Sequence, residues 1–107
     1  MTTLAEVEND VEGSRFLIRK DGEIAELTYS EIGKQILLKH TEVPKSLRGG
    51  GMAGTLAHAA LEYARSQNFK VIPVCPYVIA YLAKHPEYQS LVKGQFVPSA
   101  APKEEIG

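Results

Sequence analysis

Arg48-Gly49-Gly50-Gly51-Met52-Ala53-Gly54-Thr55 is a glycine-rich segment that lies between two periodic stretches of the chain. Before it, residues 35–43 have an apolar centre and end at Pro44, which has no amide hydrogen to give to a strand ladder. After it, apolar residues recur at helical spacing as far as Gln67. The segment is therefore expected to join a strand to an amphipathic helix.

The chain downstream extends this unit. Asn68 is expected to end the helix in a left-handed conformation, and the β-rich run of residues 71–75 follows it. Strand, loop, helix and strand in this order predict a βαβ unit with two parallel strands. A second helix begins at Pro76 and ends at His85, because Pro86 stops it, and a shorter turn continues to residue 91.

The chain upstream predicts an antiparallel hairpin. Two short runs, residues 15–20 and 23–29, are separated by Asp21-Gly22, which favours a type I′ turn. Apolar and polar residues alternate in the second run, as in a sheet with one wet face. The expected fold class is α/β, with a mixed twisted sheet, antiparallel N-terminal strands, a βαβ unit and C-terminal helices.

Length and charge limit the function classes. The 107 residues, 44% of them apolar, are enough for one core, and we expect a flexible N-terminus (1–12), one domain (13–93) and a disordered tail (94–107). Twelve basic and 13 acidic residues give no basic excess for nucleic acid or membranes. One cysteine and three scattered histidines predict no metal site. We expect a cytoplasmic protein that is a monomer or a weak dimer.

The glycine segment is placed to bind an anion. The first amides of a helix have no internal partner, and the helix dipole adds positive charge there. A dinucleotide fold would need an acidic residue about 20 positions further on, where residues 71–74 are not acidic. A phosphate loop would need a lysine where Thr55 stands. A pyrophosphate loop led by Arg48 and a plain tight loop remain as alternatives.

The motif Arg48-x-x-Gly51-x-Ala53 resembles the R-x-x-G-x-G/A signature of GNAT acetyl-CoA-dependent acyltransferases. Val43-Pro44 is similar to the lead-in common in that superfamily. Several more segments resemble its small single-domain group, often labelled YjdJ-like, and the likeness covers roughly residues 15–92. These segments are His40-Thr41-Glu42-Val43-Pro44, Leu47-Arg48-Gly49, Ala60-Leu61-Glu62-Tyr63-Ala64, Pro73-Val74-Cys75-Pro76-Tyr77 and His85-Pro86-Glu87-Tyr88.

The resemblance implies a site for acetyl-CoA or coenzyme A. Loop amides would hold the pyrophosphate, and the strand edge at Glu42 and Val43 would bind the pantetheine arm as an added strand. Relatives commonly carry lysine at the position of Gly50, so attraction to the phosphates should be weaker here. The candidate coenzyme-binding residues are Glu42, Val43, Arg48, Gly49, Gly50, Gly51, Met52, Ala53, Tyr81, Lys84 and His85. For Lys84 and His85, favourable interaction with a helix C-terminus is a sufficient alternative.

Cys75 and His40 are the candidate catalytic residues. The resemblance implies that Cys75 faces the thioester, where an acetyl-cysteine intermediate is conceivable; an ordinary core cysteine is the alternative. His40 has the chemistry to deprotonate an amine, and a structural strand histidine is equally consistent. Tyr77 and Tyr81 are one helical turn apart. They line the thioester end, act as the acid that protonates the leaving thiolate, or belong to the core.

These observations imply an acetyl-CoA-dependent N-acyltransferase that acetylates an amine directly or through Cys75. The short C-terminus predicts a shallow acceptor site, which suits a protein or peptide amine, a small polyamine, or no efficient substrate at all. The alternative from another class is a coenzyme A-binding regulatory or interaction module with little turnover. A structural domain without a ligand is the third possibility.

Overall fold

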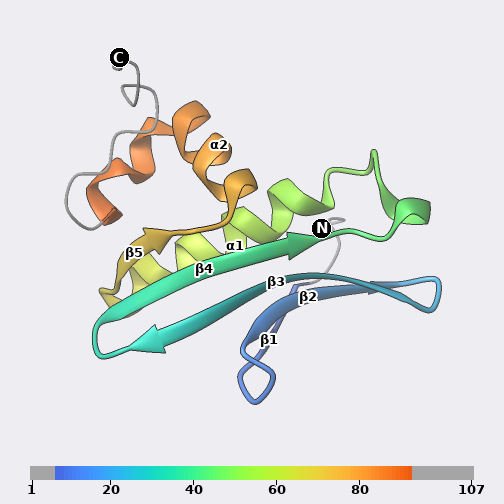
Figure 1. Ribbon diagram of the computed structural model, residues 1–107, viewed down its shortest axis with the longest axis horizontal. Helices are drawn as coiled ribbons and strands as arrows, with labels where there is room; N and C mark the ends of the chain where they lie inside the picture. The colour runs from blue at the N-terminus through green and yellow to red at the C-terminus, as the bar shows by residue number, and fades with distance from the viewer. Residues whose placement is uncertain (1–6, 93–107) are drawn as a thin grey trace.

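The computed structural model describes residues 7–92 and shows one five-stranded mixed sheet with two helices (Figure 1). The strands lie in sequence order, antiparallel from β1 to β4 and parallel between β4 and β5. The expected α/β fold and parallel βαβ unit are therefore confirmed. The elements are β1 (Glu8–Asp10), β2 (Arg15–Lys20), β3 (Glu23–Ile32), β4 (Gln35–Glu42), the 3-10 turn η1 (Lys45–Leu47), α1 (Met52–Gln67), β5 (Lys70–Pro73), α2 (Pro76–Lys84) and the 3-10 helix η2 (Pro86–Leu91).

The local turns follow the residues that favour them. Asp21 and Gly22 have φ of 53° and 78°, as a type I′ hairpin requires. Asn68 ends α1 with φ of 61°. Strand β3 continues beyond the expected residue 29, because Ile32 pairs with Gln35 across a tight turn.

Strand β1 lies within the segment that the sequence predicted to be flexible. Its backbone pairs with β2, and two ion pairs join the strands, Arg15 to Asp10 at 3.0 Å and Arg19 to Glu8 at 2.9 Å. The expectation for residues 1–12 is therefore wrong for β1. Residues 1–6 and the expected tail, 94–107, lie outside the described residues.

Helix α1 packs its apolar stripe against one face of the sheet (Figure 1). Its alanines 57, 60 and 64 are buried, which lets the helix axis lie close to the strands. The opposite sheet residues are Phe16, Ile18, Ala25, Leu27, Tyr29, Ile36 and Leu38, all in one buried cluster. This face is called the inner face below, and the other is the outer face.

Strands β4 and β5 separate halfway along β4. Their pairing runs from Gln35 with Lys70 to Leu38 with Pro73, and the carbonyl of Leu38 then accepts from the amides of both Val74 and Cys75. The chain turns at that point into α2. Among the described residues, no strand pairs with the β5-facing edge of β4 beyond Leu38. This opening is called the strand gap below.

None of the helices within residues 7–92 is long and apolar enough to cross a membrane.

Candidate functional site

The start of α1 presents unpaired amides. Gly51 precedes the helix with φ of 80°, and the first helical hydrogen bond runs from the amide of Thr55 to the carbonyl of Gly51 at 3.0 Å. The amides of residues 52–54 therefore have no helical acceptor, and no side chain caps them. The first turn also contains no acidic residue. The positive end of the helix dipole is left available for an anion.

Three contacts hold the loop before this helix. Arg48 donates from Nε to the carbonyl of Val43 at 3.0 Å, and the Ser46 hydroxyl donates to Glu23 at 3.1 Å. The side chain of Leu47 is buried. Gly49, like Gly51, has a positive φ, 92°, which favours glycine at these two positions. These contacts and the two glycine conformations together fix the shape of the loop.

A pocket of about 200 Å³ opens at the start of α1. It is lined by Val43, Leu47, Arg48, Gly49, Gly51, Met52, Ala53, Gly54 and Tyr77. Six of these residues were candidates from the sequence, whereas Leu47, Gly54 and Tyr77 were not among the coenzyme ligands. Glu42, Gly50, Tyr81, Lys84 and His85 are candidates that do not line it.

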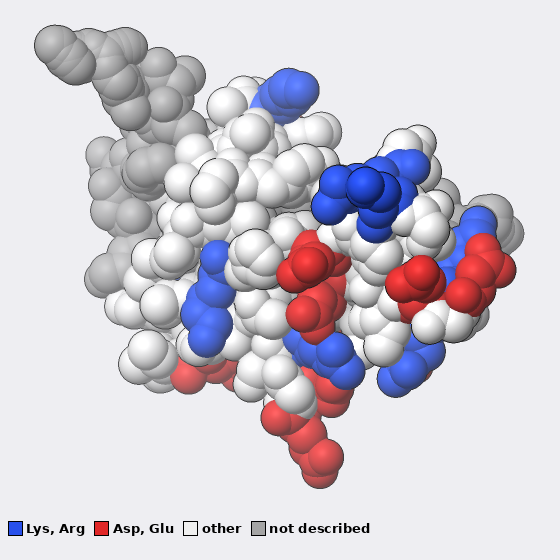
Figure 2. Space-filling model, turned by 45° about the vertical axis from the view of Figure 1, so that its right-hand side comes forward, with Lys and Arg blue, Asp and Glu red and all other residues white. Residues whose placement is uncertain are grey.

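The surface around this end of the sheet carries charges of both signs. Figure 2 shows Lys and Arg side chains beside Asp and Glu side chains, without one large patch of a single sign on the face in view. Attraction for an anion must therefore be local. This agrees with a site built from main-chain amides and Arg48.

Cys75 lies at the strand gap, directly before α2. Its side chain is 2% exposed and belongs to the apolar cluster. Its Sγ is 3.2 Å from the hydroxyl oxygen of Thr41. Thr41 is in the part of β4 that has no β5 partner, so the thiol faces the gap from the inner side. Thr41 was not a candidate from the sequence.

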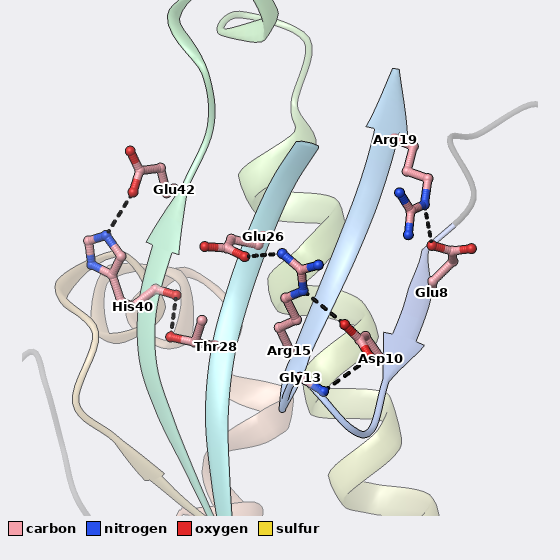
Figure 3. A network of polar contacts seen from close by, with 9 residues as sticks. All are labelled: Glu8, Asp10, Gly13, Arg15, Arg19, Glu26, Thr28, His40 and Glu42. Carbon is pink, nitrogen blue, oxygen red and sulfur yellow. Dashed lines mark hydrogen bonds and ion pairs between the residues drawn. The ribbon is translucent and has the colours of Figure 1, made fainter. Parts of the chain in front are cut away.

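His40 lies on the outer face of the sheet, with Thr28 and Glu42 beside it (Figure 3). A bulge in β4 at Lys39 places His40 opposite Thr28 and Thr41 opposite the buried Leu27. The His40 side chain is 64% exposed, and its Nε2 is 3.5 Å from Glu42. The structure therefore does not bring the two catalytic candidates together, but places them on the two faces of β4.

The outer face carries a row of paired charges across four strands (Figure 3). Arg15 bridges Asp10 at 3.0 Å and Glu26 at 2.7 Å. The bond from Arg15 holds the pKa of Asp10 below its usual value. Glu26 lies opposite Glu42 in the register, and like charges in direct register are unfavourable. Each of these two carboxylates has a basic neighbour, because Arg15 contacts Glu26 and His40 is 3.5 Å from Glu42.

Tyr77, Tyr81 and His85 form a line of rings on α2. The ring centroids of Tyr77 and Tyr81 are 6.4 Å apart, and Tyr81 stacks on His85 at 4.0 Å. Burial, first among several causes, raises the pKa of Tyr81. The rings approach α1 at Gly54, where an added Cβ would be 3.3 Å from the Tyr77 hydroxyl oxygen.

No group of His, Cys, Asp or Glu within residues 7–92 is arranged to hold a metal ion.

Comparison with known proteins identifies the family. A family model for GCN5-related N-acetyl-transferases matches residues 15–91, most of the chain. The chain belongs to the GCN5-related N-acetyltransferase family. It is 38% identical to Protein NATD1 of Gallus gallus over 89 residues, which cover 80% of this chain and 81% of that protein. It is also 38% identical to Protein NATD1 of Homo sapiens over 92 residues, 83% of this chain and 81% of that protein.

A solved family structure has the same fold. The NMR structure of a GCN5-like protein from Staphylococcus aureus aligns with a TM-score of 0.65 and 31% identity, covering 82% of this chain and 87% of that one. The family resemblance read from the sequence is confirmed. None of these matches separates the YjdJ-like group from the rest of the family, so that narrower assignment stays a prediction.

Proposed function

We propose that this chain is an acetyl-CoA-dependent N-acyltransferase, which moves an acetyl group to an amine. The supporting observation is the unpaired amides of residues 52–54, which open into a pocket beside the strand gap. Helix-start amides with glycine at their entrance suit a pyrophosphate, because a phosphate can approach the main chain closely. Membership of the GCN5-related family makes acetyl-CoA the expected donor.

The loop would hold the diphosphate and Arg48 would supply charge. Within the described residues, only Nε of Arg48 has a recorded acceptor, the carbonyl of Val43. That bond fixes the side chain, and the two terminal guanidinium nitrogens are left to face an anion. Arg48 thus has two roles, shaping the loop and attracting phosphate.

The strand gap would hold the pantetheine arm. The part of β4 from Lys39 to Glu42 has an edge without a β5 partner in the described chain, and an amide-containing arm can pair with such an edge as a strand does. With the arm bound in this way, the thioester would lie in the strand gap, which is open to both the inner and the outer face of the sheet. His40 and Cys75 would then approach it from opposite sides.

Two routes to the product follow from this placement. In the direct route, an amine on the outer face loses a proton to His40 or water and attacks the thioester carbonyl carbon. The carbon–sulfur bond breaks, and the coenzyme leaves as a thiolate that takes up a proton. In the covalent route, the Cys75 thiol gives its proton to water, and the thiolate attacks the thioester carbonyl carbon; the bond from that carbon to the coenzyme sulfur breaks, acetyl-cysteine forms, and the coenzyme thiolate takes up a proton. The deprotonated amine then attacks the acetyl-cysteine carbonyl carbon, the bond from that carbon to the Cys75 sulfur breaks, and the Cys75 thiolate is protonated again.

The experiment is calorimetry and thermal shift with acetyl-CoA, coenzyme A, ATP and NAD, followed by a turnover assay over an amine panel. A ligand that binds only the native state raises the apparent stability. Stabilisation by acetyl-CoA and coenzyme A alone, with amine-dependent release of coenzyme, is expected. Stabilisation by ATP or NAD instead would contradict the proposal.

Intact mass separates the two routes. Acetyl-CoA without an amine should add one acetyl group to the wild type and none to Cys75→Ala if the covalent route operates. If the wild type gains no acetyl group but still acetylates amines, the direct route remains.

The exposure of His40 favours one second candidate, a coenzyme A-binding module with little turnover. The His40 side chain is 64% exposed, lies 3.5 Å from Glu42 and has no contact with Cys75. It is therefore poorly enclosed for a catalytic base. Tight coenzyme binding without turnover on any amine would support the module.

A further inference from the structure

The hydroxyl of Thr41 contacts the buried thiol at the strand gap. Its Oγ1 is 3.2 Å from Sγ of Cys75, and in the neutral pair either atom can donate. Within the described part of the chain, no other hydrogen bond is recorded for either of these two side chains. The two groups are therefore partners of each other, and neither side chain is tied to the backbone.

The bulge in β4 makes this contact possible. Side chains alternate along a strand, so a regular β4 with Leu38 on the inner face would turn Thr41 outward. The shift in register at Lys39 instead pairs Thr41 with Leu27, which is buried on the inner face. Bulges are common next to active sites, where they redirect a side chain. One extra residue in the strand thus brings a hydroxyl to the thiol.

The thiol is at the positive end of α2. Cys75 directly precedes the helix, and the first helical hydrogen bond runs from the amide of Ile79 to the carbonyl of Cys75 at 3.0 Å. Pro76 has no amide hydrogen, and the amides of Tyr77 and Val78 have no helical acceptor. The first turn contains no acidic residue. The helix dipole therefore favours negative charge close to Sγ.

The apolar surroundings of the thiol oppose that charge unless a donor is present. Cys75 is 2% exposed, and the buried cluster around it contains no charged side chain among the described residues. His40 and Glu42, which flank Thr41 on β4, are on the outer face (Figure 3). Tyr77, the nearest titratable residue on α2, lines the pocket and is 40% exposed. The Thr41 hydroxyl is consequently the side-chain donor recorded at Sγ within residues 7–92.

We propose that Thr41 is a positioning residue of the covalent route, whose hydroxyl donates to Sγ and stabilises the Cys75 thiolate. The inference rests on the proposed function, in which acetyl-CoA brings its thioester to the strand gap. The thiol gives its proton to water, and because a thiolate has no proton, the hydroxyl is then the donor. The thiolate attacks the carbonyl carbon, the bond from that carbon to the coenzyme sulfur breaks, and the coenzyme thiolate takes up a proton. Thr41 keeps its own proton throughout.

Loss of the hydroxyl should change the reactivity of the thiol in opposite directions at low and high pH. A hydrogen bond to a charged group favours that group by a factor of about ten or more, so the pH midpoint of thiolate formation should rise by about one unit. A thiolate also becomes more nucleophilic as it becomes more basic, with a slope of about 0.4–0.5. Reaction with a disulfide should therefore be about threefold slower below the midpoint and about threefold faster on the high-pH plateau.

The test is the rate at which Cys75 forms a mixed disulfide with hydroxyethyl disulfide, followed by intact mass over a series of pH values. The reagent has no charged group, so the pH dependence reports on the protein. Thr41→Val removes the hydroxyl at nearly constant volume, whereas Thr41→Ser keeps a hydroxyl. The wild type and Thr41→Ser should follow one profile, and the profile of Thr41→Val should cross it. In Thr41→Ala, which leaves space beside the thiol, the midpoint should rise as well.

Thr28→Val is the matched control. Its hydroxyl is beside the bulge but on the outer face, where it donates to the carbonyl of His40 at 3.4 Å (Figure 3). This variant should keep the wild-type profile. A change of the rate by one factor at all pH values in Thr41→Val would indicate altered access to the thiol. That result, or equal profiles in Thr41→Val and Thr41→Ser, overturns the inference.

A second measurement connects the hydroxyl to the proposed reaction. Below the midpoint, acetyl-cysteine should form from acetyl-CoA about threefold more slowly in Thr41→Val, while the affinity for coenzyme A measured by calorimetry should not change. A wild type that acetylates amines without forming acetyl-cysteine also overturns the inference, and the proposed function then stands through the direct route. If the wild type binds no coenzyme A, both fall.

Discussion

Gly51→Ala tests whether the conformation of the glycine loop, and not its glycine content, makes the site. Gly51 has φ of 80°, where a side chain is strained, and it directly precedes the free amides of α1. Left-handed backbone costs an ordinary residue about 1–2 kcal/mol. For a domain of this size that is a fall of roughly 5–15 °C in the unfolding midpoint.

Gly50→Ala is the matched control in the same loop. Gly50 does not have a positive φ, and its added Cβ would meet only the carbonyl oxygen of Leu47 at 3.6 Å, an ordinary contact. The midpoint should stay or rise slightly, because alanine restricts the unfolded chain. Both variants are measured by thermal unfolding and by calorimetry with coenzyme A.

Coenzyme A affinity should follow the backbone strain. In Gly51→Ala the amides at the start of α1 are turned from their positions, so affinity should fall about tenfold, the equivalent of one lost hydrogen bond. In Gly50→Ala it should stay within about twofold. Equal losses in the two variants, or no loss in Gly51→Ala, would refute the reasoning.

Three further predictions concern charge and pH. Gly50→Lys adds a cation at a position with space, so coenzyme A should bind more tightly at low salt and the gain should disappear at high salt; calorimetry at two ionic strengths measures this. Arg48→Glu removes the bond to the Val43 carbonyl and repels phosphate, so coenzyme A should no longer change the unfolding midpoint, and an unchanged response would count against the loop. The pKa of Tyr88 is raised to about 12, by burial and by its hydrogen bond to Glu62, and that of Tyr63 to about 12, chiefly by its hydrogen bond to Glu31. Because the folded state favours the neutral phenols, the two tyrosines should stabilise the fold fully below pH 10 and lose this contribution as the pH rises from 10 to 12. Denaturant titrations over this range should show a smaller fall in the free energy of unfolding for Tyr88→Phe than for the wild type.

Much of the fold could be predicted because its signals are local. Asp21-Gly22 specifies a turn, Pro44 ends a strand, and the apolar period marks α1 within one residue of its observed ends. Strand β1 has no such pattern. Its three residues are held by pairing and by ion pairs from β2, which no short window of sequence contains.

In the site, as in the fold, the features set by a few neighbouring residues could be predicted and those set by strand pairing could not. The glycine loop was predictable, since glycine and a helix start act over a few residues. The faces of β4 were not, because Ile36, Leu38 and His40 alternate as though all three point inward. The bulge at Lys39 shifts that alternation, turns His40 outward and brings Thr41 to Cys75. Nothing in the sequence marks the bulge.

The most direct test of the account is a titration of the isotopically labelled protein with coenzyme A, followed by amide NMR shifts. Diphosphate binding at the start of α1 predicts the largest changes at the amides of residues 49–54, with Thr41 and Tyr77 also affected. Shifts confined to β1 and β2, or none at saturating coenzyme A, would contradict it.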